Sequence, residues 1–237
     1  MKSNIQQLNS RGYIENKDIE KYNDFSRNQL IELLEANEPI KHTIAVIHLG
    51  KFKDVDILDL LISKLTIEKK LYTKIALSET IANYGEKASD KLIIYLGIVG
   101  NNQHIKMPDK PFNKTSYPLP RDIIARTLVK IGKPALTSLK KCICNGAYNQ
   151  VLEAVDAIGF ISFYTKDISA LQDILNLLNQ YRNDELMVWK IIRALQSFRD
   201  EAVESILKFY SQSNIKQHKL EAKRSFAQIK KEIKTTQ

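Results

Sequence analysis

The chain has 237 residues, of which 43% are hydrophobic and 27% are charged, and it carries a formal net charge of +9 at pH 7. This composition excludes a disordered, collagen-like or disulfide-rich chain and allows a sizeable apolar core. The longest apolar stretch, residues 92–100, falls far short of the roughly 18 residues that indicate a membrane span. Because the N-terminal segment is polar, we expect no secretory signal or membrane anchor, and therefore a cytoplasmic protein.

The predicted elements begin with residues 1–25, a polar arm or atypical first unit. A helix is predicted at 26–36, where Ser26 and Gln29 have the spacing of a capping box. Helical pairs are then predicted to start near Pro39, Lys70, Arg121, Asn149 and Asp184. A last helix at 216–234, with an apolar stripe and a charged outer side, is expected to close the array. Residues 26–237 are therefore predicted to form one repeat domain.

A short pattern recurs in the first helix of each pair: two apolar residues three positions apart, followed by glycine. The copies are Val46/Leu49/Gly50, Ile81/Tyr84/Gly85, Leu128/Ile131/Gly132 and Val155/Ile158/Gly159, with a degenerate one at Leu195/Phe198/Arg199. Glycine readily adopts the left-handed conformation that ends many helices. Each copy is therefore predicted to be a hairpin in which the first helix ends at the glycine. Second helices are expected near 57–65, 88–96, 136–143, 168–178 and 203–210.

Segments 34–52, 69–88 and 122–135 resemble HEAT-like repeats of the phycobilisome-lyase type. The first of them contains the acidic-proline turn Glu38-Pro39 that precedes a first helix in such repeats. The resemblance covers roughly residues 26–234 and implies an all-α fold, a right-handed α-solenoid of HEAT-like helical hairpins. It specifies a fold better than a function, because such armadillo-like arrays bind many different partners.

The repeat is interrupted at residues 101–120, a segment that holds four of the six prolines: Pro108, Pro111, Pro118 and Pro120. No helix can run through this segment. Its apolar side chains are Met107, Phe112, Tyr117 and Leu119. One interpretation is that they pin the segment onto neighbouring helices, and the other is that the segment binds a partner. Packing is favoured, since apolar loop residues mostly pack.

Positive charge is concentrated in residues 101–141, which contain nine Lys or Arg and two acids. Six of these cations lie on two successive predicted helices and the turn between them. This central basic patch consists of Arg121, Arg126, Lys130, Lys133, Lys140 and Lys141. It is the candidate partner-binding surface, because such a patch indicates an acidic partner. The alternative is that these cations are simply the solvated sides of helices.

No catalytic or metal-binding motif is found. The four histidines, His42, His48, His104 and His218, form neither an HExxH motif nor a close pair on one helical face. The sequence has no His-Glu pair of the kind on which HEAT-repeat hydroxylases depend, and no phosphate-binding glycine loop. Cys142 and Cys144 are expected to be free thiols in or beside the core. We therefore expect no metal and no cofactor.

Single residues with possible roles have structural interpretations. Acidic residues, among them Asp54, Asp56, Asp156 and Asp184, are assigned to helix caps and polar faces. Trp189 is assigned to the core. The sequence thus favours a non-catalytic scaffold that binds another protein in a groove lined by the second helices. Nucleic-acid binding through the central basic patch is the alternative, and a lyase or DNA base-excision enzyme on the same fold is a third hypothesis.

Overall fold

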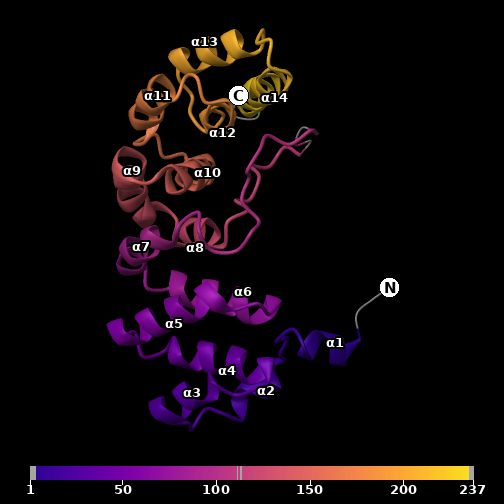
Figure 1. Ribbon diagram of the computed structural model, residues 1–237, viewed down its shortest axis with the longest axis vertical. Helices are drawn as coiled ribbons and strands as arrows, with labels where there is room; N and C mark the ends of the chain where they lie inside the picture. Colours follow the sequence, from indigo (N-terminus) through magenta and orange to yellow (C-terminus); the bar gives the residue numbers. More distant parts are fainter. Residues whose placement is uncertain (1–3, 111, 113, 235–237) are drawn as a thin grey trace. The chain divides into compact units, whose positions relative to one another are not determined.

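The protein is described by a computed structural model that covers residues 4–110, 112 and 114–234 (Figure 1). The described residues form α-helices and two short 3-10 helices, with no strand, so the all-α prediction is confirmed. They divide into two compact units, residues 1–92 and 93–237. Among the described residues, no helix has the length and apolar character needed to cross a membrane.

The N-terminal unit contains α1 (Ile5–Asn9), α2 (Asn16–Glu20), α3 (Arg27–Leu33), α4 (Pro39–Leu49), α5 (Val55–Ile67), α6 (Leu71–Ala82) and α7 (Glu86–Leu92). In this unit α4 packs against α3 and α6, and α5 packs against α6 and α7. Leu49, Leu61 and Leu77 are fully buried there. Helix α3 begins after the Ser26–Gln29 capping box, which confirms that prediction.

Hydrogen bonds join the predicted N-terminal arm to this unit. Thr43 Oγ1 donates to the carbonyl of Gly12 over 2.8 Å, and the N–H of Tyr72 donates to the carbonyl of Arg11 over 3.0 Å. Arg11 and Gly12 therefore lie against the starts of α4 and α6. Part of the segment that the sequence left as an arm or atypical unit is thus packed.

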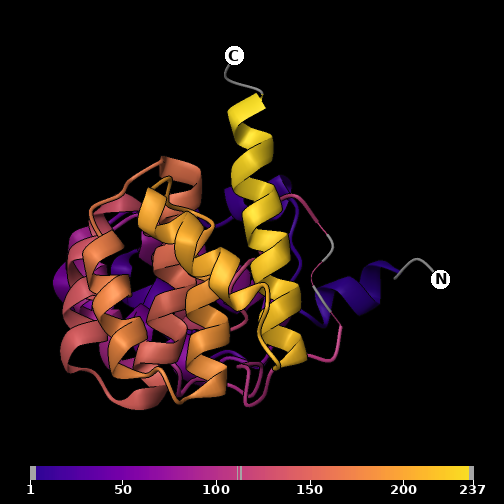
Figure 2. The same cartoon turned by 90° about the horizontal axis from the view of Figure 1, so that it is seen from above.

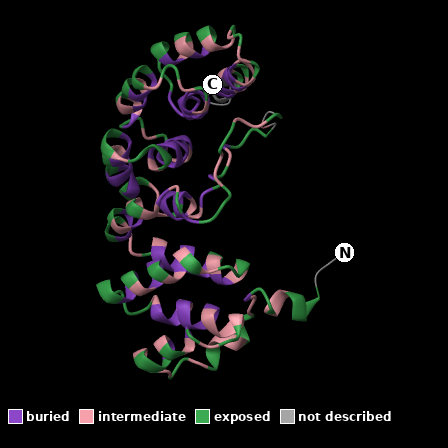
Figure 3. Ribbon diagram, viewed as in Figure 1, coloured by how far each residue is buried: buried purple, intermediate pink, exposed green. Residues whose placement is uncertain are grey.

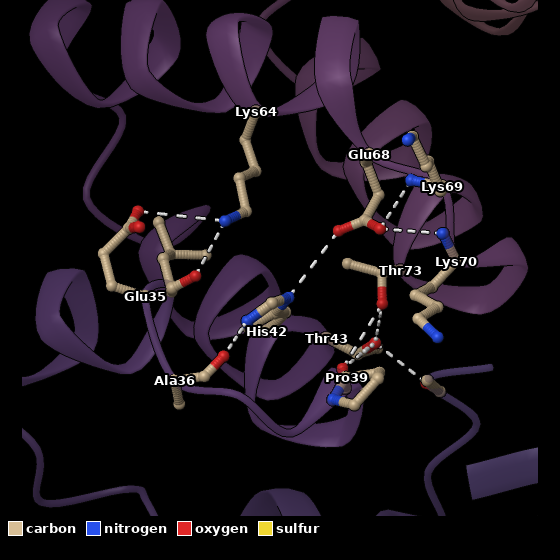
Figure 4. Close-up of polar contacts among 12 residues, drawn as sticks. Glu35, Ala36, Pro39, His42, Thr43, Lys64, Glu68, Lys69, Lys70 and Thr73 are labelled. Atoms are coloured by element: carbon tan, nitrogen blue, oxygen red, sulfur yellow. Dashed lines mark hydrogen bonds and ion pairs between the residues drawn. The ribbon is translucent and has the colours of Figure 1, made fainter. Parts of the chain in front are cut away.

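Figure 4 shows how the turn between α5 and α6 is held. Glu68 Oε1 accepts the N–H groups of Lys69 and Lys70, each over 2.7 Å. Its other oxygen lies 3.7 Å from Nδ1 of His42, whose Nε2 contacts the carbonyl of Ala36. Glu68 thus holds the turn through its two backbone N–H partners. His42 contacts the carbonyl of Ala36 and lies within ion-pair distance of Glu68.

The C-terminal unit contains η1 (Ile93–Tyr95), α8 (Ile123–Ile131), η2 (Lys133–Ala135), α9 (Leu136–Asn145), α10 (Tyr148–Thr165), α11 (Leu171–Gln180), α12 (Glu185–Leu195), α13 (Glu201–Tyr210) and α14 (Lys216–Lys234). Helices α8, α10, α12 and α14 each pack against the next, and we call them the inner row. Helix α9 packs against both α10 and α11, and α11 also packs against α12. Figure 3 shows that α10 and α12 are the most deeply buried part of this unit.

Residues 101–120 form an irregular segment, here called the proline segment, that packs against the inner row. Figure 2 shows it on the opposite side of α14 from α11 and α13. Gln103 fixes its beginning, because Gln103 Nε2 donates to Asp122 Oδ2 over 2.7 Å, and Asp122 caps α8 by accepting the N–H of Ala125. Pro111 lies outside the described residues.

The apolar side chains of the proline segment behave in two ways. Tyr117 is only 2% exposed, and its ring lies 6.0 Å from Phe160 and 5.7 Å from Phe163 of α10. The packing interpretation is therefore confirmed for Tyr117. Leu119, by contrast, is 51% exposed. The ring of Phe112 lies 5.7 Å from the guanidinium of Arg224 on α14.

The repeated glycines do not all end helices. Gly85 and Gly132 have φ values of +62° and +78° and lie in turns, as predicted. Gly50 follows α4 in the right-handed conformation, with φ −59°. For Gly159 the prediction is wrong, because α10 continues through it to Thr165.

Gly159 makes room for the proline segment. A Cβ atom at this position would lie 2.0 Å from the hydroxyl oxygen of Tyr117 and 3.0 Å from Cα of Ala194 on α12. The absence of a side chain therefore lets Tyr117 insert beside α10. The glycine pattern in this copy reflects a long-range contact and not a helix end.

We predict that Gly159→Ala destabilises the protein by about 1–2 kcal/mol, because overpacking at Tyr117 outweighs the gain in helix propensity. The measurement is the free energy of unfolding in urea. Repeating the substitution in a Tyr117→Ala background should recover at least half of the loss. A stabilising Gly159→Ala would show that Tyr117 does not occupy this space.

Candidate functional site

A cavity of about 610 Å³ lies in the C-terminal unit, between the proline segment and the inner row. We call it the inner cavity. The helical residues that line it belong to α10 and α12, which are the first helices of their predicted pairs. The sequence analysis placed a binding groove on the second helices, and that placement stays a prediction. The volume lies within the range of roughly 300–1,000 Å³ that is typical of ligand sites.

The exposed edge of the inner cavity carries positive charge. Lys110, Lys114 and Arg121 line it, and all three are exposed to solvent. Among the described residues, none of the three has a carboxylate within ion-pair distance. We call them the edge cations. Within the described part of the chain their charges are therefore unpaired.

Aromatic rings form one wall of the inner cavity. Asp156, Phe160 and Tyr164 are spaced four residues apart on α10, so they share one face of the helix. The rings of Phe160 and Tyr164 lie 4.6 Å apart, and Tyr164 is 52% exposed. Tyr117 lies against the same wall. The wall therefore offers stacking surface that solvent, or a ligand, can reach.

The buried end of the inner cavity adjoins an ion cluster. Lys190 on α12 is fully buried, and its Nζ lies 2.7 Å from Glu153 Oε1 and 2.9 Å from Asp156 Oδ2. It also donates to the carbonyl of Leu152. The second carboxylate oxygens, Glu153 Oε2 and Asp156 Oδ1, have no hydrogen-bond partner among the described residues. Buried polar groups without partners are costly and are a common mark of functional sites.

Burial and charge act differently on the two carboxylates. Burial raises the pKa of Glu153 to about 7, even though Lys190 favours its ionised form. Burial also disfavours ionised Asp156, but the combined charges of Lys190 and Arg193 lower its pKa below the ordinary value. Asp156 is therefore the ionised member of the pair at neutral pH, and it is the one that lines the inner cavity.

Arg193 joins α12 to α14 at the same end of the cavity. Its guanidinium lies 3.9 Å from the centre of the Trp189 ring, and its Nε lies 3.5 Å from Glu221 Oε1. Glu221 also accepts a hydrogen bond from Arg224 Nε over 3.0 Å. Trp189 is buried, which confirms its assignment to the core. The carboxylate of Glu221 thus lies within ion-pair distance of both arginines.

His104, on the proline segment, lies between the inner cavity and a second cavity of about 390 Å³ that Glu153 and Tyr148 line. Its ring packs edge-on against Trp189 at 5.2 Å, and its Nδ1 has no partner. Burial lowers the pKa of His104 to about 4, with the nearby cations Lys190 and Arg193 adding to the effect. His104 is therefore neutral at pH 7.

The central basic patch is divided in the structure. Arg121 lies at the inner cavity, together with Lys110 and Lys114, which the sequence analysis had not singled out. Arg126 donates from Nε to the carbonyl of Pro120 over 2.6 Å, so it helps hold the end of the proline segment. Only Arg121 of the six patch residues lines the cavity.

The patch residues beyond α8 have neighbours on the next pair. Lys133 lies 3.4 Å from Asp167, and Lys140 lies 3.2 Å from Asp173. Lys130 and Lys141 are exposed, and Lys130 has an interaction of its own. Part of the positive charge of the patch is thus offset within the fold. A role for the patch in binding stays a prediction.

Several residues of the site escaped the sequence analysis. Asp156 was assigned to a polar face, and this was wrong, because it is buried within α10. Lys190 and Arg193 were not considered, although they interrupt the otherwise apolar stretch 187–195 of α12. Charged residues within an otherwise apolar helix are rarely buried unless they are paired with an opposite charge. The two cations of this stretch could therefore have predicted the ion cluster.

Metal ligands do not gather in the part of the chain that the structure describes, where no three His, Cys, Asp or Glu side chains are grouped as a metal site. Cys142 is buried, and burial raises its pKa to about 11, whereas Cys144 is exposed. Both are free thiols, and the predicted place in the core is confirmed for Cys142 only.

No protein-family model matches this sequence, and the comparison with curated proteins gave no match. The resemblance to HEAT-like repeats therefore stays a prediction from the sequence pattern. The function has to be argued from the geometry of the inner cavity.

We predict that Glu153 makes the protein less stable as the pH rises from 4.5 to 7. The pKa of this group is raised from its ordinary 4.5 to about 7, so the folded state holds the proton more tightly than the unfolded chain does. Its contribution is fully present below pH 4.5 and is lost as the pH rises through 7. Glu153→Gln should remove this dependence, which we expect to be on the order of 2 kcal/mol.

The measurement is the free energy of unfolding in urea at pH 4.5, 6 and 7.5 for both proteins. Asp156 has the opposite sign, since its lowered pKa adds stability above 3.8 that is lost on acidification. Starting at pH 4.5 keeps most of that effect out of the comparison. Parallel pH profiles for wild type and Glu153→Gln would contradict the prediction.

Proposed function

We propose that this chain is a non-catalytic binding scaffold, an α-solenoid of right-handed HEAT-like hairpins that docks an acidic segment of another protein at the inner cavity. The helix row α8, α10, α12 and α14, flanked by α9 and α11, supports the repeat part of the proposal. Its binding part is supported by the inner cavity, which the proline segment and the inner row form together.

The observation that carries the proposal is the unpaired positive edge. Lys110, Lys114 and Arg121 have no ion-pair partner among the described residues, while the buried end of the cavity is balanced by its own acids. Complementary charge steers partners and selects among them. An acidic polypeptide supplies carboxylates to the edge, and its apolar groups can pack on the aromatic wall.

A protein partner is preferred over nucleic acid because positive charge is limited. Lys133 and Lys140 of the central basic patch are paired with Asp167 and Asp173. Long phosphate backbones need several free cations along a track. Three edge cations at one cavity suit a short acidic segment better.

Nucleic-acid binding is the second candidate, and one observation favours it. The edge cations line the same cavity as the rings of Phe160 and Tyr164. Cations beside exposed rings are the chemistry by which proteins hold single strands. A base-excision enzyme would in addition need a carboxylate at such a place, and Asp156 lines the same cavity.

The test compares two probes, fluorescein-labelled poly-L-glutamate and a 20-nucleotide single-stranded DNA, by fluorescence anisotropy. The edge variant is Lys110→Glu/Lys114→Glu/Arg121→Glu. Its matched control is Lys141→Glu/Lys216→Glu/Lys223→Glu, which changes the net charge equally at exposed positions away from the cavity. We expect the edge variant to weaken polyglutamate binding about tenfold or more and the control about threefold or less.

Equal losses in the two variants would show a general charge effect and would contradict the proposed docking site. Tighter binding of the DNA, with a slope of log affinity against log salt near −2 that the edge variant abolishes, would favour the second candidate, since about 0.7 is lost per neutralised phosphate. If the protein released a base from a methylated form of the same DNA, the scaffold proposal would be rejected in favour of a base-excision enzyme.

A further inference from the structure

We infer that the inner cavity is a site for a nucleoside phosphate, with the base at the buried end and the phosphate at the edge cations. The ligand is either a free nucleotide or one unpaired nucleotide of a strand, since both present the same chemistry. This inference goes beyond the proposed function and concerns the interior of the cavity, which polyglutamate need not enter.

The phosphate end is assigned by charge. Lys110 and Lys114 come from the proline segment and Arg121 from the residue that follows it, and all three line one cavity. A phosphate monoester carries close to two negative charges at neutral pH and three acceptor oxygens, so it can accept from three cations at once. Charge-assisted hydrogen bonds of this kind are the stronger ones. A single carboxylate would leave the edge with excess charge.

The middle of the cavity is assigned by its aromatic wall. Phe160 and Tyr164 lie one helical turn apart on α10, and half of the Tyr164 surface is exposed. A flat heteroaromatic base can stack on such rings, a contact that is commonly worth about 1–3 kcal/mol per base. Along this face of α10 the exposure falls from Tyr164 through Phe160 to the buried Asp156, and all three line the cavity.

The buried end is assigned by Asp156. This side chain is almost fully buried, lines the cavity, and has one carboxylate oxygen, Oδ1, without a hydrogen-bond partner. Lys190 engages only the other oxygen, Oδ2, over 2.9 Å. An ionised carboxylate can only accept hydrogen bonds, so it calls for a donor on the ligand. The exocyclic amino groups of adenine, cytosine and guanine are such donors.

The order of these groups distinguishes a nucleotide from a phosphorylated side chain. A phosphotyrosine entering the cavity would carry its phosphate foremost, toward the carboxylate of Asp156. A nucleotide can enter with its base foremost and leave its phosphate outside, next to Lys110, Lys114 and Arg121. The buried end of the cavity holds Asp156 together with Arg193, whose charge is already paired with Glu221, and the unpaired cations line the edge. This arrangement suits the nucleotide.

The test is calorimetric titration of the whole chain at constant ionic strength with AMP, GMP, CMP, the matching nucleosides, and inorganic phosphate. We expect at least one of the three nucleotides to bind about tenfold or more tightly than both its nucleoside and phosphate. Equal affinity for phosphate and nucleotide would leave only an anion site and overturn the inference. No binding of any nucleotide at 10 mM, a concentration on the order of the weakest ligands of interest, would also overturn it.

Separate variants test the phosphate end and the aromatic wall of the cavity. Lys110→Gln/Lys114→Gln should lower nucleotide affinity to that of the nucleoside and leave nucleoside binding unchanged, whereas the control Lys141→Gln/Lys216→Gln should change neither. Phe160→Leu should weaken nucleotide and nucleoside alike. Loss of Asp156 would strip Lys190 of a partner and endanger folding, so the aromatic variant is preferred. Unchanged nucleotide binding in both cavity variants would place the nucleotide elsewhere and refute the inference.

The two proposals can fail separately. Failure of every nucleotide to bind the wild-type chain, while polyglutamate binds it and the edge variant weakens that binding, rejects only the nucleotide site. The opposite result rejects only the acidic protein partner. Competition between the bound nucleotide and single-stranded DNA would identify a strand as the source, and absence of competition would identify a free nucleotide. Both of these outcomes support a nucleoside phosphate in the cavity.

Discussion

Tyr117 packs beside α10 only because Gly159 has no side chain, and the site depends on this contact. The proline segment cannot fold as a helix, so its position is set by what it touches. Gln103 holds its beginning at the cap of α8, and Tyr117 holds its end against α10. Lys110 and Lys114 lie between these two anchors. Lys110 and Lys114 line the inner cavity because the proline segment is anchored to the helices before and after them, at Gln103 and Tyr117.

The second constraint is the distribution of charge across the inner row. Lys190, Arg193, Glu153, Asp156 and Glu221 are all buried, and each has an opposite charge within ion-pair distance. A buried cluster of this kind contributes little net stability, because desolvation offsets the attraction. Its consequence is a cavity whose buried end carries paired charges and whose exposed edge carries unpaired positive charge. Both the acidic protein segment and the nucleoside phosphate are inferred from that asymmetry.

Local patterns predicted the helices, and distant contacts decided the site. The starts of α4, α6, α8, α10 and α12 fall within two residues of the positions expected from apolar spacing and caps, because those signals lie inside each helix. Gly159 was misread, since the residue that explains it, Tyr117, lies in another segment. Asp156 was likewise misplaced, because its partners Lys190 and Arg193 meet it only when α10 and α12 pack together. A local sequence pattern does not predict a contact between residues on two different helices.

Trp189 offers the most direct measurement of whether the proline segment covers the inner row. It is the only tryptophan in the chain, it is 2% exposed, and His104 packs on its ring. Acrylamide quenching of its fluorescence should be weak in the wild type and should rise several-fold when residues 104–117 are replaced by a short Gly/Ser linker, while far-UV circular dichroism stays helical. Strong quenching in the wild type, or quenching that the replacement leaves unchanged, would contradict the docked segment on which the site depends.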